Sequence, residues 1–135
     1  MDECLFCKII AGEIPSQKIY EDEKTFAFLD INPVNPGHTL VVPKEHSENI
    51  YDTSEDNWTA VMKTTKMLAP IIKKAVGADG INLEMNNEKA AGQIIFHTHV
   101  HIVPRIDDDG FRHWPGTPYK DGEEEKIANS IRTLL

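Results

Sequence analysis

Apolar and polar residues alternate in several short stretches of the chain, a pattern typical of half-buried β-strands. The clearest stretch spans residues 96–105, where histidines occupy every second position and β-branched or apolar residues fill most of the others. In a strand this alternation places His97, His99 and His101 on one face and the intervening side chains on the other. Four further strands are predicted at residues 18–21, 25–29, 38–42 and 81–85.

One long stretch has helical periodicity instead. From about residue 54 to 76, apolar residues recur every three or four positions, which predicts an amphipathic helix. Pro70 lies inside this span and has no N–H to donate, so we expect a kink or a lost hydrogen bond near Lys66. Shorter helices are predicted at residues 3–11 and at the C-terminus, where the glutamates at 123–125 favour a helix start.

The order of these elements predicts the fold class. Three strands, a long central helix and two more strands leave few parallel crossovers, and short helices flank them at both ends. We therefore expect an α+β fold with an antiparallel sheet of about five strands. At 135 residues, with no visible repeat or linker, the chain should form one domain over residues 1–135.

Charge and hydropathy narrow the range of partners. The formal net charge is −8, whereas a nucleic-acid-binding protein presents a basic surface. No stretch approaches the roughly 20 apolar residues that a membrane helix needs. The acidic start, Met1-Asp2-Glu3, is unlike the basic start of a signal peptide. We expect a cytoplasmic protein whose partners include neither nucleic acid nor a membrane, and in which local donors hold any phosphate ligand.

Three histidines on one strand face allow three interpretations. They could be polar residues on a solvated face, although neighbouring cations on one face repel each other. They could bind a metal, but a rise of about 3.3 Å per residue separates the outer pair by roughly 13 Å, too far to share one ion. Finally, one histidine could be a nucleophile and the others could handle protons or charge.

The chain has two cysteines, which form a Cys-x-x-Cys pair at Cys4 and Cys7. No strand precedes this pair, which argues against a thioredoxin-like redox motif. Two interpretations remain: half of a zinc site, with His46 and His97 as candidates to complete it, or two small apolar residues on the buried face of the helix.

Several segments, in order along the chain, resemble the histidine triad family of nucleotide hydrolases and transferases. Residues 97–103 (HTHVHIV) resemble the family signature, and residues 86–93 (NNEKAAGQ) resemble the loop that precedes it. Residues 28–33 (FLDINP) and 36–44 (PGHTLVVPK) resemble the nucleoside-binding segment and the strand that follows. Residues 4–15 (CLFCKIIAGEIP) resemble the opening helix. The small nucleoside-phosphoramidase branch is the most similar.

The resemblance implies residue roles. His99 would attack the α-phosphorus, His101 would contact the phosphate and protonate the leaving group, and His38 would complete the polar cluster. Asp30 would accept hydrogen bonds from the ribose, although an Asp in this position also commonly starts a turn. Ile94 occupies a position where some relatives have a phosphate-contacting serine. The implied phosphate, sugar and base contacts comprise Asp30, Ile31, Asn86, Gly92, Gln93 and Ile94 with the apolar residues Phe6, Ile10, Phe28 and Leu40.

The implied activity is hydrolysis of nucleoside 5′-phosphoramidates, with a purine nucleoside monophosphate linked to an amine, through a nucleotidyl-histidine intermediate. Two alternatives stay open. One is a diadenosine polyphosphate hydrolase or nucleotidyl transferase of the same superfamily. The other is a nucleotide-binding regulatory module with residual activity.

The resemblance also implies a structural zinc ion and a partner subunit. The zinc ligands would be Cys4, Cys7, His46 and His97, and no cofactor would be needed for catalysis. The protein would be a two-fold homodimer. The segment of about residues 106–135, with His113 and Trp114 in a Gly- and Pro-rich loop, would either contact the partner subunit or fold back on its own domain.

Overall fold

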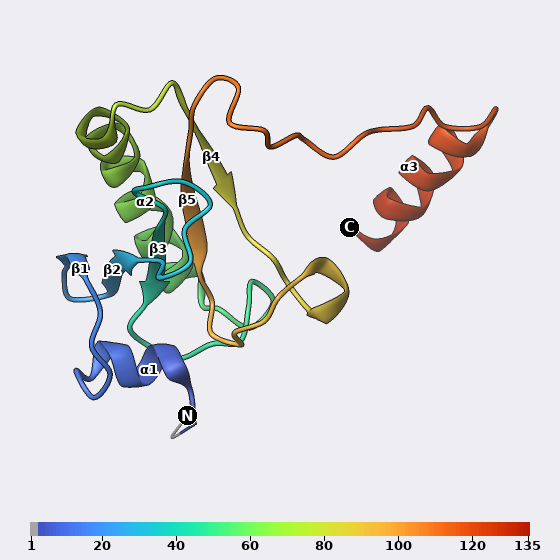
Figure 1. Cartoon of the computed structure of the whole chain (residues 1–135). Helices are drawn as coiled ribbons and strands as arrows, with labels where there is room; N and C mark the ends of the chain where they lie inside the picture. Colours follow the sequence, from blue (N-terminus) through green and yellow to red (C-terminus); the bar gives the residue numbers. More distant parts are fainter. Residues whose placement is uncertain (1–2) are drawn as a thin grey trace.

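The computed structural model describes residues 3–135, and its core is an antiparallel five-stranded sheet with the order β1-β2-β3-β5-β4 (Figure 1). The predicted α+β fold is therefore confirmed. Four strands lie within one residue of their predicted bounds, and the last begins later than expected. The strands are β1 (Lys18–Glu21), β2 (Thr25–Leu29), β3 (Thr39–Pro43), β4 (Gly80–Glu84) and β5 (Val100–Arg105).

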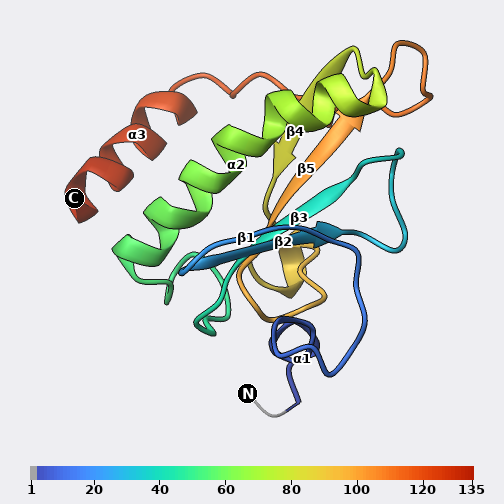
Figure 2. The same cartoon turned by 90° about the vertical axis from the view of Figure 1, so that its left-hand side faces the viewer.

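The long helix α2 (Glu55–Val76) covers one face of the sheet (Figure 2). Its N-cap is Ser54, whose side chain accepts a hydrogen bond from the Asn57 N–H. The helix continues unbroken through Pro70, so the predicted disturbance is confined to the one donor that proline lacks. Its buried side chains pack with one set of strand residues: Val61, Leu68 and Ile72 against Ala27, Val41, Val100 and Ile102.

The short helix α1 (Leu5–Ile10) lies on the opposite side of the sheet (Figure 2). Successive strand residues point to opposite faces, so Ala27 faces α2 while its neighbours face α1. Two aromatic rings illustrate this packing, because Phe6 of α1 meets Phe28 edge to face with ring centroids 5.3 Å apart. The second core consists of Phe6, Ile9, Phe26, Phe28, Leu40 and Val42.

The histidine-rich segment departs from the prediction in one respect. Strand pairing starts only at Val100, so His97 and His99 precede β5 in a stretch without a partner strand. The Thr98 N–H donates to the Ser47 carbonyl at 2.8 Å, which holds this stretch extended. The predicted alternation is nevertheless confirmed, since His99 and His101 line a cavity beside α1 while Val100 packs in the α2 core.

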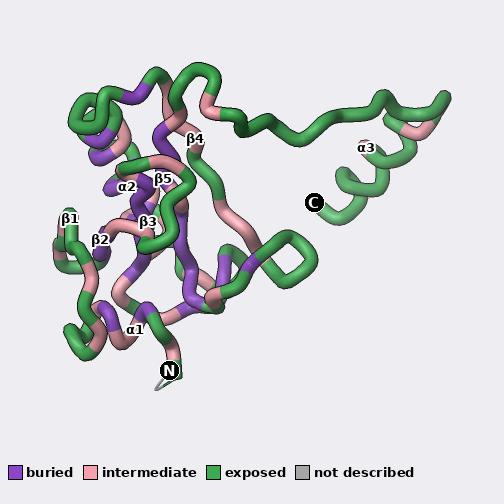
Figure 3. Tube along the Cα trace, viewed as in Figure 1, coloured by how far each residue is buried: buried purple, intermediate pink, exposed green. Residues whose placement is uncertain are grey.

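The C-terminal part of the chain leaves the sheet after β5. Helix α3 (Glu123–Leu134) confirms the predicted helix, but it lies apart from the sheet and none of its residues is buried (Figures 1 and 3). Where the chain departs, Arg105 and Asp109 form a two-pronged ion pair with N–O distances of 2.7 and 2.8 Å. The guanidinium holds the pKa of the Asp109 carboxyl well below its usual range.

No helix of residues 3–135 is both long enough and apolar enough to cross a bilayer.

Substitution of Gly37 tests how tightly the loop before β3 packs against Val76 and Pro104. Its φ of 94° strains any L-residue, and an added Cβ would lie 2.8 Å from Val76 Cγ1 and 3.2 Å from Pro104 Cγ. We predict that Gly37→Ala lowers the free energy of unfolding by about 2–4 kcal/mol, because strain and overpacking add. Gly12→Ala is the matched control, since Gly12 has a φ of 80° and no heavy atom within 4 Å.

In Gly12→Ala the free energy of unfolding should fall by only about 1–2 kcal/mol, the cost of backbone strain at positive φ. Urea unfolding of both variants measures the difference. Equal losses would show that Val76 and Pro104 do not restrict this loop.

Candidate active site and metal cluster

A cavity of about 450 Å³ opens on the α1 side of the sheet, where α1, the end of β2 and the start of β5 meet. Most of the predicted substrate-contacting residues line it. Sequence reasoning missed part of its apolar wall, including Ile14 and Pro15, which follow α1 without a periodic signal. The predicted residues that line the cavity are Phe6, Phe28, Asp30, Ile31, Leu40, Asn86, Gly92, Ile94, His99 and His101.

Two of the predicted contact residues, Ile10 and Gln93, do not line the cavity. Ile10 instead packs against the core beneath α1. The Gln93 side chain is buried and engaged, because its Nε2 donates to the carbonyls of Glu48 at 2.6 Å and Ile95 at 3.0 Å. Its Oε1 accepts from the Glu88 N–H at 2.8 Å. Gln93 therefore holds the loop together, and a motif position alone could not reveal this.

His99 is held in one tautomer. Its Nδ1 lies 2.6 Å from the backbone carbonyl of His97, and because a carbonyl can only accept, Nδ1 must carry the proton. The other ring nitrogen, Nε2, then has a free lone pair. The ring packs edge to face on Phe6, with centroids 5.1 Å apart and an interplanar angle of 88°. His99 thus presents an oriented, unprotonated nitrogen.

His38 and His101 form a directed pair. The Val34 N–H donates to His38 Nδ1 at 3.1 Å, so in the neutral ring the proton sits on Nε2. That Nε2–H donates to His101 Nδ1 at 2.8 Å, which in turn places the proton of neutral His101 on its Nε2. The His99 and His101 rings are 5.0 Å apart. A donor N–H therefore stands beside the His99 nucleophile candidate.

Burial keeps these rings neutral. It is the main cause that lowers the pKa of His38 and of His99, and it lowers the pKa of His101 to about 4 with help from His99 and His38. An uncharged imidazole is the form that has a lone pair for nucleophilic attack. The site is thus set for chemistry by neutral histidines near pH 7.

Asp30 lies at the end of β2 and faces this pair. Its Oδ1 accepts from the Asn32 N–H at 2.8 Å, which is the turn contact expected for an Asp in this position. Its Oδ2 lies 3.7 Å from His38 Nε2. The turn interpretation of Asp30 is therefore confirmed; Asp30 also lines the cavity, and its ribose contact stays a prediction.

The loop opposite Asp30 ends in the short helix η1 (Lys89–Ala91), followed by Gly92 with φ 94°. A Cβ on Gly92 would meet only ordinary contacts, 3.9 Å from Asn86. Glycine is thus required for the backbone conformation that aims this loop at the cavity rather than for space. Ile94 follows with 85% of its surface exposed, so it stands at the cavity mouth.

A second group of side chains, which we call the Cys/His cluster, consists of Cys4, Cys7, His46 and His97. His97 Nδ1 lies 3.4 Å from Cys4 Sγ, 3.5 Å from Cys7 Sγ and 3.2 Å from His46 Nδ1. A tetrahedral zinc ion with bonds of about 2.0–2.3 Å separates its ligand atoms by roughly 3.3–3.8 Å. The spacing of the four donor atoms therefore suits one zinc ion.

The proton positions in the Cys/His cluster also suit a metal. His97 Nε2 lies 2.8 Å from the Pro43 carbonyl, so Nε2 carries the proton and Nδ1 turns its lone pair toward the sulfurs. Burial, followed by the Cys4 sulfur, raises the pKa of the Cys7 thiol to about 11. A bound cation would have to displace that proton and would take the sulfur as a thiolate.

Asp30, His38 and His101 also bring three donor groups within 4.8 Å of one another. Their hydrogen bonds argue against a metal. His38 Nδ1 accepts from the Val34 N–H, so the nitrogen that faces the group is protonated and has no lone pair to give. This group is therefore poorly suited to a metal, whereas the Cys/His cluster is the candidate metal site.

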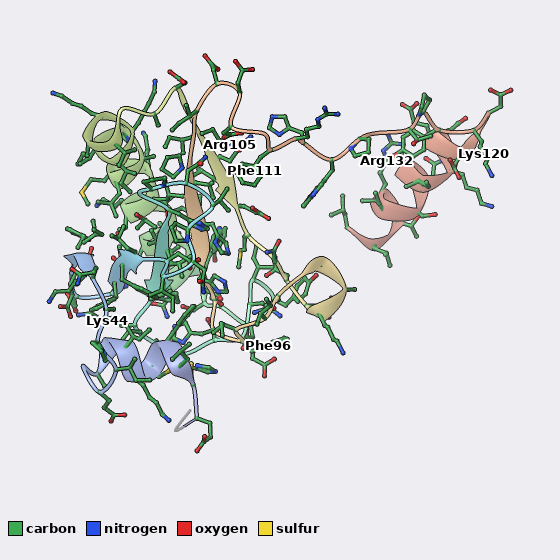
Figure 4. The ribbon with its side chains drawn as sticks, viewed as in Figure 1. Lys44, Phe96, Arg105, Phe111, Lys120 and Arg132 are labelled. Carbon is green, nitrogen blue, oxygen red and sulfur yellow. The ribbon has the colours of Figure 1, made fainter. Side chains whose placement is uncertain are left out.

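The predicted loop residues His113 and Trp114 lie outside this cavity. Trp114 has 85% of its surface exposed and lies in a shallow pocket beside β4 with Leu83 and Phe111. Figure 4 shows Arg105 and Phe111 close together where the chain leaves the sheet. The guanidinium lies 5.7 Å from the Phe111 ring centre and donates to the Phe111 carbonyl, which fixes the start of this loop. The sequence did not indicate this contact.

Comparison with known proteins gives a consistent result. The family described as the HIT domain matches residues 11–108. The adenosine 5′-monophosphoramidase hnt1 of Schizosaccharomyces pombe is 35% identical over 135 residues, covering 98% of each chain. The crystal structure of a HIT family member from Bacillus subtilis superimposes with a TM-score of 0.91 at 43% identity, covering 98% of this chain and 97% of that one.

A zinc-bound histidine triad family protein from Mycobacterium smegmatis has a TM-score of 0.78 and 34% identity, covering 98% of this chain and 96% of that one. The family match covers all five strands, the part of the cavity lining that follows α1, and all three histidines of residues 97–101. This chain belongs to the histidine triad (HIT) family.

Proposed function

We propose that this protein hydrolyses nucleoside 5′-phosphoramidates, releasing a nucleoside monophosphate and an amine. The observation that carries the proposal is the fixed tautomer of His99, whose free Nε2 is available beside the His101 donor. Membership of a family that includes a 5′-monophosphoramidase supports the same class of reaction. Dinucleoside polyphosphates are the alternative substrate class, because the same nucleophile could attack their α-phosphorus.

Substrate binding would use the cavity walls. The apolar wall, which includes Phe6, Phe28 and Leu40, suits a purine base, and its volume of about 450 Å³ is in the range of a nucleotide site. Asp30 would accept hydrogen bonds from the ribose hydroxyls. The N–H groups of Gly92 and Gln93 already donate to backbone carbonyls, so the Ile94 N–H would be the donor that this loop brings to the phosphate, with Asn86 beside it.

The reaction would then proceed in two steps. His99 Nε2 attacks the α-phosphorus, the P–N bond breaks, and the His38–His101 pair gives the leaving amine a proton. The bound phosphate anion favours uptake of that proton by the pair beforehand. In the second step, water attacks the phosphorus, His101 accepts its proton and the bond to His99 breaks. Splitting one displacement into two lowers each barrier.

We further propose that the Cys/His cluster holds one structural zinc ion. Four protein ligands leave no open position for water, so the metal would tie α1 to the sheet and would not coordinate a reacting group. The free thiols suit a reducing compartment such as the cytoplasm.

Finally, we propose a homodimer. Within the described residues β4 lies at the edge of the sheet and pairs only with β5, and Leu83 on it is 51% exposed. An open edge with apolar side chains favours pairing with a second copy. In Figure 1 the chain after β5 runs away from the sheet and from α1 to helix α3, which suits contact of this segment with the partner subunit.

The nucleophile assignment predicts the behaviour of His99→Ala. Turnover of adenosine 5′-phosphoramidate should fall by on the order of 10⁴-fold or more, because no other group can form the covalent intermediate. The affinity for the nucleoside monophosphate should change by less than about threefold, since Asp30 and the apolar wall remain. Steady-state kinetics and calorimetric titration measure the two quantities. Substantial activity in the variant would refute the assignment.

The zinc proposal predicts one zinc ion per chain and a large effect of its loss on stability. Cys4→Ser should lower the melting temperature by about 10 °C or more, because each kcal/mol shifts it by roughly 3–5 °C in a domain of this size and a lost ligand costs several kcal/mol. Elemental analysis and thermal unfolding measure both. Chelated wild type should match the variant and recover on adding zinc; protein without zinc and with unchanged stability would contradict the proposal.

The assembly proposal predicts a mass of twice the 15.2 kDa chain by light scattering at micromolar concentration. Trp114→Ala should change the preference among amine leaving groups by several-fold, since Trp114 would reach the partner's cavity. Tyr119→Ala is the control, because Tyr119 is also exposed in the same segment but lines none of the pockets beside β4. A fully active monomer, or unchanged selectivity in Trp114→Ala, would rule out this arrangement.

A further inference from the structure

We propose that the Cys/His cluster positions the nucleophile, in addition to stabilising the fold. The cluster would act through His97, which belongs to the cluster by its ring and to the active site by its backbone carbonyl. This inference rests on the assignment of His99 as the nucleophile.

His97 is the link between the two sites. Its ring is fully buried and held on both edges, by the Pro43 carbonyl at Nε2 and by the cluster at Nδ1. Its carbonyl accepts the Nδ1–H of His99 at 2.6 Å. A shift of the His97 ring therefore moves the acceptor that fixes the His99 tautomer.

The sheet does not fix this acceptor. Strand pairing begins at Val100, so the peptide between His97 and Thr98 has no ladder hydrogen bonds. The Thr98 N–H of this peptide donates to the Ser47 carbonyl at 2.8 Å. The carbonyl belongs to His97, so its position depends on how the His97 side chain is held. The Thr98 hydroxyl adds hydrogen bonds to Ser47 and Thr53 on the N–H side, whereas on the His97 side the peptide unit is anchored through the ring, which the Pro43 carbonyl and the Cys/His cluster hold.

Phe6 provides a second connection. It lies between Cys4 and Cys7 in sequence, and its ring contacts His97 and His99 with centroids 6.0 and 5.1 Å away. Cys4 caps α1 and Cys7 lies within it, so contacts that fix the two sulfurs also fix the helix. The helix in turn positions Phe6, against which the His99 ring packs. The two connections act on the orientation of one imidazole.

The consequence concerns the proton of His99. If the His97 carbonyl moves away, Nδ1–H loses its acceptor and the tautomer with the proton on Nε2 becomes populated. That tautomer has no lone pair toward the cavity and cannot attack phosphorus. Disturbing the cluster should therefore reduce the fraction of nucleophilic His99 even in folded protein.

The test compares His46→Ala with Thr64→Val. Among residues 3–135, His46 does not line the cavity but belongs to the Cys/His cluster, with Nδ1 at 3.4 Å from Cys7 Sγ and 3.2 Å from His97 Nδ1. Thr64 bonds to Thr25 at 2.8 Å in the buried region under α2, on the other face of the sheet, so its loss costs stability without touching the cluster. Both variants are studied well below their melting temperatures.

Two readouts are used, neither of which reports fold stability. In ¹⁵N-histidine spectra, His99 of the wild type should be protonated on Nδ1, while His46→Ala should show a mixture of tautomers. The kcat of His46→Ala should fall by about 10–100-fold, because the contact that orients His99 is loosened and not removed, with the Kd for the nucleoside monophosphate changed by less than about threefold. Thr64→Val should change none of these.

An unchanged His99 tautomer and kcat in folded His46→Ala would overturn the proposal, as would equal changes in Thr64→Val. If His46→Ala fails to fold, Cys7→Ser replaces it with the same expectations. The spectra need no substrate, so they decide the positioning role separately. A wild type that shows the Nδ1 tautomer but does not hydrolyse phosphoramidates would refute the proposed substrate class and leave the positioning role intact.

Discussion

The hydrogen bond from His99 Nδ1 to the His97 carbonyl is the constraint on which the active site depends. At 2.6 Å it decides which nitrogen of His99 carries the proton and which way the ring faces. Without it, an imidazole in an apolar cavity could adopt either tautomer, and only one of them is a nucleophile here. Two residues of separation along an extended chain are enough to bring the acceptor and the ring together.

The same principle separates the histidines by role. The His97 Nε2–H donates a hydrogen bond to the Pro43 carbonyl, so Nδ1 has the free lone pair that a metal ligand needs. His38 receives a backbone N–H at Nδ1 and so offers a proton at Nε2, as a proton relay must. Side chains of one type thus acquire opposite proton positions from single backbone groups, which suit the different roles proposed for them. The carbonyl belongs to Pro43 at the end of β3, and the N–H belongs to Val34 in the loop before β3.

The sequence predicted much of this because its signals were local. Alternation and helical spacing located the strands, α2 and α3, and the two-residue spacing of His97, His99 and His101 predicted their common face. The resemblance to the family supplied the roles of residues whose contacts are distant in sequence. What could not be predicted depends on tertiary contacts: the hydrogen bonds that engage Gln93, the packing of Ile10 into the core, and the late start of β5. The two-pronged ion pair between Arg105 and Asp109 could not be predicted, because oppositely charged residues four positions apart are common on protein surfaces.

The central claim is that the His99 Nε2 nitrogen is the attacking atom, and a trapped intermediate tests it most directly. Protein with ¹⁵N-labelled histidine, reacted with a slowly hydrolysed nucleoside phosphoramidate, should show one-bond coupling between phosphorus and the Nε2 nitrogen of His99. The Nδ1 nitrogen of the same ring should keep its proton, still donated to the His97 carbonyl. Coupling to Nδ1, or to any other histidine, would contradict the account.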